Sequence, residues 1–175
     1  MEKTRSVDFG ALTLKDALDL ATLVEEEAKD RYEELGDQME IHHNPEAATF
    51  FRWMRRIESK HEDQLAMRRA ELFGTAPRTV RREMIFDIEA PEYDEARAAM
   101  TVREALGAAL RSEEKAFAFF DAAVSQVRDA AVRALFEELR ADEAEHQRLV
   151  QAEIDKLPPD PLLRAVDAGD EPVAQ

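Results

Sequence analysis

The sequence predicts an all-α fold, a bundle of four helices built from two antiparallel hairpins that one long connection joins. Three observations support this prediction. The composition is helix-prone, with 45% hydrophobic residues, 36% charged residues and only five glycines among 175 residues. A helical pattern occurs twice, and each copy contains two segments that lack an internal proline. We therefore expect one domain over residues 1–157, followed by a C-terminal tail over 158–175.

The first and third helices begin at two copies of one short pattern. The residues Leu12–Leu18 (LTLKDAL) reappear 88 positions later as Met100–Leu106 (MTVREAL). In both copies an acidic residue follows a threonine by three positions, which is the spacing of a helix-starting capping box. The sequence therefore predicts helices over 13–40 and 101–126.

The second and fourth helices repeat at an offset of 85 residues. The matching positions are Phe51 and Phe136, Glu58 and Glu143, and His61 and His146. We expect the second helix over 46–73, because a glycine can end it, and the fourth over 129–157, because two prolines follow it.

The connection between the two hairpins is long enough to run the length of the bundle. Its 27 residues, 74–100, reach roughly 80 Å when extended, whereas a helix of about 26 residues is only about 40 Å long. The third helix can therefore begin at the end of the bundle opposite to where the second helix ends. An apolar cluster within the connection, Ile85, Phe86 and Ile88, indicates that part of it packs against the helices.

Each predicted helix carries ligand-type side chains inside an otherwise apolar stripe. In the first helix, steps of three and four residues pass through Leu18, Ala21, Glu25, Ala28 and Tyr32. The same spacing in all four helices gives six candidate metal ligands: Glu25, Glu58, His61, Glu113, Glu143 and His146. Buried carboxylates are costly unless they are paired or bind a cation. Two divalent ions would neutralise the four carboxylates, so we expect a metal site in the core.

The spacing within the second and fourth helices favours a site for two metals. Glutamate and histidine three residues apart lie on one face of a helix, so each glutamate can bridge two ions while each histidine binds one. Oxygen ligands with two imidazoles suit iron or manganese. We expect two iron ions per chain, with manganese as the alternative.

Two further features of the sequence bear on the predicted site. A third Glu-x-x-His, from Glu40 to His43, lies off the apolar stripe and is not expected to bind metal. Tyr32 lies two turns after Glu25 on the stripe and is the candidate catalytic residue, because its hydroxyl can hydrogen-bond a ligand carboxylate or pass an electron. An ordinary core tyrosine is the alternative, and the equivalent residue in the second copy is Phe120.

With these motifs, residues 13–157 resemble the ferritin-like superfamily, and most closely its rubrerythrin-like and bacterioferritin-like groups. The motifs are Glu25-x-x-Ala-x-x-x-Tyr32, Glu58-x-x-His61, Glu113-x-x-Ala116 and Glu143-x-x-His146. The resemblance implies a ferritin-like bundle with a di-iron centre that reacts with dioxygen or hydrogen peroxide. It also implies that Glu58 and Glu143 bridge the two ions and that Glu25 and Glu113 are terminal ligands.

The sequence departs from both groups. Rubrerythrins carry a further glutamate at the position of Ala116 and usually append a cysteine-ligated iron domain, whereas this chain has no cysteine. Reduction of the site would then require an external electron donor. Bacterioferritins bind haem through a methionine at the position of Ser59, so no haem is expected.

The leading hypothesis is oxidation of Fe(II) by peroxide or dioxygen, in iron handling or oxidative-stress defence. It would make the protein an oxidoreductase of the ferroxidase or peroxidase type. Three alternatives stay open: an iron storage or cargo protein without turnover, a di-iron oxygenase acting on an organic substrate, and a metal-free helical interaction module.

Composition also limits the partners. A net charge of −15 argues against nucleic acid and anionic membranes. No apolar run of about 18 residues occurs, and the first residues lack the pattern of a signal peptide, so we expect a cytoplasmic protein. Phe50, Trp53 and Ile57 form a second apolar strip, for which a subunit interface of a homodimer or larger homo-oligomer is expected, with core packing as the alternative.

Overall fold

The computed structural model describes residues 7–84, 88 and 100–159. These residues form four long helices and two short 3-10 helices and contain no strand, which confirms the all-α prediction. The elements are η1 Phe9–Ala11, α1 Leu14–Ile41, α2 Pro45–Phe73, η2 Arg82–Met84, α3 Val102–Val124 and α4 Ala130–Lys156. In the described part of the chain, no helix carries an apolar stretch long enough to cross a membrane.

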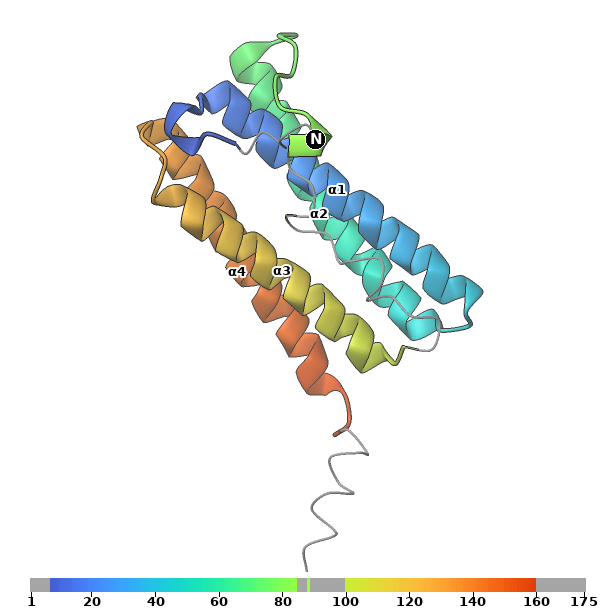
Figure 1. The fold of residues 1–175 in the computed structure, drawn as a ribbon. Helices are drawn as coiled ribbons and strands as arrows, with labels where there is room; N and C mark the ends of the chain where they lie inside the picture. Colours follow the sequence, from blue (N-terminus) through green and yellow to red (C-terminus); the bar gives the residue numbers. More distant parts are fainter. Residues whose placement is uncertain (1–6, 85–87, 89–99, 160–175) are drawn as a thin grey trace, which may run out of the picture.

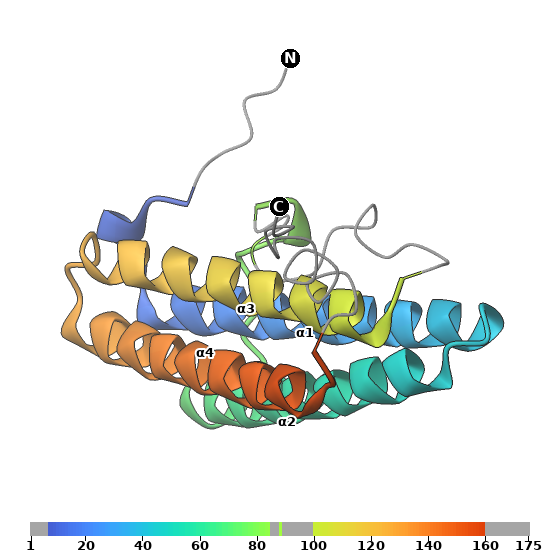
Figure 2. The same ribbon diagram turned by 90° about the horizontal axis from the view of Figure 1, so that it is seen from below.

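Helices α1 and α2 pack together as one hairpin, and α3 and α4 as the other (Figures 1 and 2). The connection starts beside the beginning of α1, where the Thr79 N–H donates to the Asp19 carboxylate at 3.0 Å. It ends beside the α1–α2 turn, where the Asn44 side chain donates to the Met100 carbonyl at 2.8 Å. The two ends of the connection therefore lie at opposite ends of the bundle, as predicted. Ile85 and Phe86 lie outside the described residues, while Ile88 is buried in the core.

Short polar side chains start all four helices. The side chains of Thr13, Asn44, Thr101 and Asp129 each accept a hydrogen bond from a backbone N–H of the first turn. At Thr101 the capping box is complete, because the carboxylate of Glu104 accepts from the Thr101 N–H at 2.6 Å. These caps satisfy N–H groups that have no partner within the helix. The caps at Thr13 and Thr101 are the two that the sequence predicted.

The apolar core consists of two clusters. One contains Leu18, Phe120, Phe136 and Leu139, and the other contains Tyr32, Phe51, Met54, Leu106 and Val150. Along α1 the buried stripe passes from Ala21 in the first cluster to Ala28 in the second, and Glu25 lies between them. The predicted ligands thus occupy the level of the bundle that separates the two apolar clusters.

A buried ion pair attaches the connection to the first hairpin. Asp19 of α1 has no exposed surface and accepts hydrogen bonds from Arg69 of α2, from Lys15 at 2.9 Å and from the Thr79 N–H. Burial raises the pKa of Asp19, but the bonds from Arg69, Lys15 and Thr79 outweigh burial and lower it. The Arg69 guanidinium also donates to the Ala76 carbonyl at 2.7 Å. This network fixes the end of α2 and the start of the connection against α1.

Replacing Asp19 by alanine should destabilise the protein by about 3 kcal/mol, because it leaves the Arg69 charge buried without its partner. Urea unfolding followed by circular dichroism measures the change. Glu145→Ala is the control: Glu145 is exposed and paired with Arg148 at 2.7 Å, so its loss should cost less than about 1 kcal/mol. Equal losses in the two variants would contradict the structural role of Asp19.

Candidate metal centre

Five of the six predicted ligands are removed from solvent. Glu58 and Glu113 are 0% exposed, Glu25 and Glu143 are 1% exposed, and His146 is 3% exposed. His61 is only partly buried. The side chains come from all four helices and meet between the two apolar clusters, so the helical spacing identified an interior site.

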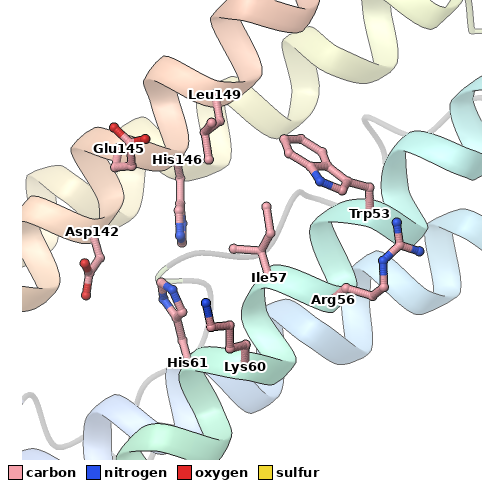
Figure 3. A pocket seen from close by; sticks show the side chains of 9 residues that line it. All are labelled: Trp53, Arg56, Ile57, Lys60, His61, Asp142, Glu145, His146 and Leu149. Atoms are coloured by element: carbon pink, nitrogen blue, oxygen red, sulfur yellow. The ribbon is translucent and has the colours of Figure 1, made fainter.

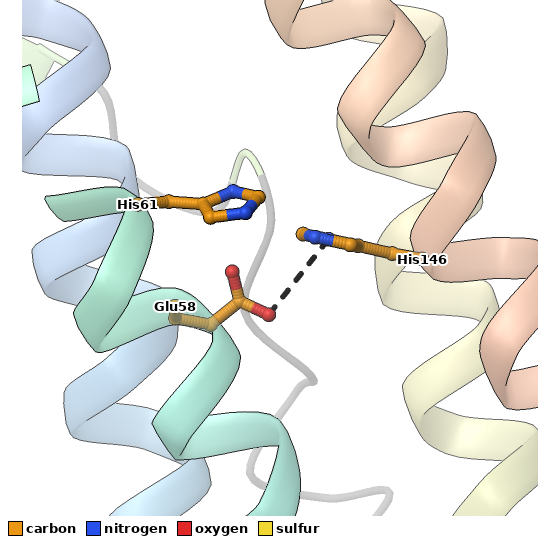
Figure 4. Close-up of side chains that lie close together, drawn as sticks. All are labelled: Glu58, His61 and His146. Carbon is orange, nitrogen blue, oxygen red and sulfur yellow. Dashed lines mark ion pairs between the residues drawn. The ribbon is translucent and has the colours of Figure 1, made fainter. Parts of the chain in front are cut away.

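His146 lies at the centre of the carboxylates. Its Nδ1 is 3.0 Å from Glu113 Oε2 and 3.5 Å from Glu143 Oε2. The same nitrogen is 3.9 Å from Glu58 Oε1, across the space between α4 and α2 (Figure 4). The His61 ring faces His146, with 4.8 Å between the ring centroids. Side chains from α2, α3 and α4 therefore converge on one imidazole.

These side chains form two groups that can each hold a metal ion. One group is Glu58, His61 and His146, and the other is Glu113, Glu143 and His146; within each, ligand atoms lie within 4.8 Å of one another. His146 belongs to both groups, so the two sites are adjacent. Glu25 is buried but belongs to neither group. The structure thus brings five of the six predicted ligands into two neighbouring groups.

The carboxylate oxygens fit bound cations. Among the described residues, no hydrogen-bond partner is present for Glu25 Oε2 or for either side-chain oxygen of Glu58 and Glu143. Buried acceptors without partners are costly, and metal coordination removes that cost. Four carboxylates and two imidazoles are also a donor set that suits iron or manganese. The residues present therefore fit two divalent ions.

The electrostatics of the cluster favour protonation when no cation is bound. Burial, together with the neighbouring carboxylates, raises the pKa of Glu25 to about 7 and the pKa values of Glu58 and Glu143 well above 4.5. Burial lowers the pKa of His146, but the hydrogen bond with Glu113 and the nearby carboxylates of Glu143 and Glu58 outweigh burial and raise it to about 12. Burial and the charge of His146 lower the pKa of His61 to about 4. Metal binding therefore has to displace protons from the cluster.

Tyr32 contacts a predicted ligand from the opposite hairpin. Its hydroxyl is fully buried and donates to Glu113 Oε1 at 2.5 Å. The other oxygen of Glu113 contacts His146. The position equivalent to Tyr32 in the second hairpin is Phe120, which is also buried, so the two halves of the site differ in hydrogen bonding.

A pocket of about 330 Å³ between α2 and α4 leads to the site (Figure 3). His61 and His146 line it, together with Trp53, Arg56, Ile57, Lys60, Asp142, Glu145 and Leu149. Sequence reasoning missed this pocket and its charged residues. The one available signal was the spacing of Arg56 and Lys60, which places both on one face of α2.

Neighbouring acidic and histidine residues lie away from the site. Glu40 is 57% exposed and pairs with Arg52 at 2.9 Å, and His43 is exposed as well. Neither belongs to a metal-type group among the described residues. Glu62 pairs with Lys29 at 2.6 Å. The third Glu-x-x-His is therefore separate from the buried cluster.

Comparisons with known proteins agree with this geometry. A model of the family described as Rubrerythrin matches residues 16–154. The crystal structure of an uncharacterized conserved protein from Magnetospirillum magnetotacticum MS-1 is similar to this chain, with 32% sequence identity and a TM-score of 0.65. The match covers 85% of this chain and 98% of that chain. No curated protein matches the sequence.

The metal-free protein should lose stability as pH rises from about 5 to 8. The pKa of Glu25 is higher in the folded state than in the unfolded chain. Its contribution to the free energy of unfolding is therefore fully present below pH 4.5 and is lost as the pH rises through about 7. The raised pKa values of Glu58, Glu143 and His146 also make stability fall as pH rises, whereas the lowered pKa of His61 makes it rise. Thermal unfolding of chelator-treated protein should show a fall in Tm of roughly 5 °C.

The double variant Glu58→Gln, Glu143→Gln separates this effect from general charge repulsion. Its Tm should fall less between the same pH values, because two of the buried groups no longer ionise. An identical fall in both proteins would show that the buried carboxylates are not its cause.

Proposed function

Because the chain belongs to the rubrerythrin family of the ferritin-like superfamily, we propose that it is a di-iron carboxylate protein that oxidises Fe(II) with hydrogen peroxide or dioxygen. Its place would be in iron handling or oxidative-stress defence. The observation that carries the proposal is the buried cluster in which two Glu-x-x-His pairs, from α2 and α4, face each other across the core. Bound iron would supply the electrons that reduce the oxidant.

The proposal assigns a role to each ligand. Glu58 and Glu143 would bridge the ions, because both of their carboxylate oxygens are buried and have no hydrogen-bond partner among the described residues. Glu25 and Glu113 would be terminal ligands, one from each hairpin. His61 and His146 would each bind one ion, and their rings already lie 4.8 Å apart.

Tyr32 would orient Glu113 and carry the proposed catalytic role. Its hydrogen bond occupies Glu113 Oε1 and leaves Oε2 directed toward His146. A hydroxyl that holds one carboxylate oxygen restricts the rotation of the other. The buried hydroxyl also lies close enough to the site to take part in electron transfer.

Two features separate this chain from a self-sufficient peroxidase. The position where rubrerythrins have a further glutamate is Ala116, which is fully buried and supplies no ligand. The chain has no cysteine with which to bind a second iron centre. We therefore propose that reducing equivalents come from a separate electron donor.

The first test counts metal ions. Anaerobic protein incubated with excess Fe(II) and then desalted should retain about two iron ions per chain by elemental analysis. The double variant Glu58→Gln, Glu143→Gln should retain far fewer, because both proposed bridges lose their charge. Glu40→Gln, which changes the exposed Glu-x-x-His, should bind as much iron as the parent chain.

The second test follows oxidation. Addition of peroxide to protein loaded with two equivalents of Fe(II) should produce a ferric absorption band and consume about one peroxide for every two iron ions. Retention of many more than two irons per chain would favour storage instead. No band and no consumption of peroxide would remove the proposed activity.

A further inference from the structure

Two basic side chains lie at the mouth of the metal centre. Arg56 and Lys60 are one turn apart on α2, and both line the pocket that ends on His61 and His146. Figure 3 shows Lys60 beside His61 and Arg56 on the same helix below Trp53.

Among the described residues these two side chains have no acidic partner, unlike the other arginines of α2. Each of those arginines forms an ion pair: Arg52 with Glu40 and Asp37, Arg55 with Glu33, Arg68 with Glu138, and Arg69 with Asp19. By contrast, no ion pair or hydrogen bond joins Arg56 or Lys60 to any residue that the structure describes. Both side chains are exposed and line the pocket, in a chain whose net charge of −15 makes acidic side chains abundant.

The opposite wall of the pocket carries two acidic residues of α4, Glu145 and Asp142. The Glu145 carboxylate accepts hydrogen bonds from Arg148. No ion pair among the described residues joins either acid to Arg56 or Lys60. An anion entering the pocket along α2 would therefore meet two basic side chains that form no ion pair with a described residue.

The remaining walls are apolar. Trp53, Ile57 and Leu149 line the same pocket. A second pocket of about 400 Å³ shares Trp53 and Arg56 with the first, and its apolar lining comes from Phe50, Val102, Leu106 and Leu157; Glu46 and Glu153 also line it. Space for an apolar body thus adjoins the two positive charges.

We propose that the pocket between α2 and α4 is a binding site for a small organic anion, a carboxylate carried on an apolar or aromatic body. The carboxylate would accept charge-assisted hydrogen bonds from Arg56 and Lys60, and the body would pack against Trp53. The ligand would lie next to His61 and His146, at the open side of the metal centre. The role of this position in catalysis rests on the proposed function, but binding of the anion does not.

The single tryptophan of the chain makes the proposal directly testable. Benzoate is the probe, and the fluorescence of Trp53 in chelator-treated, full-length protein at low ionic strength is the signal. Benzoate should change the fluorescence saturably. The double variant Arg56→Gln, Lys60→Gln should bind it at least ten times more weakly. Arg52→Gln, which removes an exposed and paired charge from the same helix, should bind it as the parent chain does.

Two control probes complete the experiment. Benzamide, which lacks the charge, and inorganic phosphate, which lacks the apolar body, should both bind more weakly than benzoate. Binding of benzoate that is unaffected by the double variant, or binding of phosphate or benzamide as tight as that of benzoate, would overturn the proposal. Portions of the same preparations are reloaded with Fe(II) and their bound iron is counted, so a failure of anion binding with two irons retained leaves the proposed function standing.

Discussion

The cost of burying four carboxylates in one layer of the core is the constraint on which the rest of the structure depends. Glu25, Glu58, Glu113 and Glu143 are at most 1% exposed, and such groups are tolerated only when protons or cations neutralise them. One protonated His146 can offset one negative charge, whereas two divalent ions can offset all four. The four helices therefore hold the acidic side chains in one buried layer, where cations can neutralise them.

The duplicated hairpin explains how the four helices bring the candidate ligands to one level of the bundle. Each hairpin contributes one helix with a lone glutamate and one with Glu-x-x-His, and the long connection lets the two hairpins meet with these residues at the same level. The apolar clusters above and below the layer supply the burial that stabilises the fold. The Asp19–Arg69 ion pair fixes the start of the connection, and neither residue belongs to the layer of buried carboxylates.

Much of this arrangement could be predicted from the sequence. The helices followed from apolar periodicity and from caps such as Thr101, because both depend on residues close together in the chain. The interior position of the ligands followed from the same periodicity. Features that depend on how the helices meet could not be predicted: the sharing of His146 by two ligand groups, the separation of Glu25 from both, and the pocket beside Lys60.

The measurement that tests the account most directly is anomalous diffraction from crystals soaked with ferrous salt, recorded on both sides of the iron absorption edge. The account predicts two iron peaks inside the bundle, one beside each group of ligands around His146. An interior without iron peaks, or iron found only on exposed carboxylates, would contradict the claim that cations neutralise the buried acidic layer.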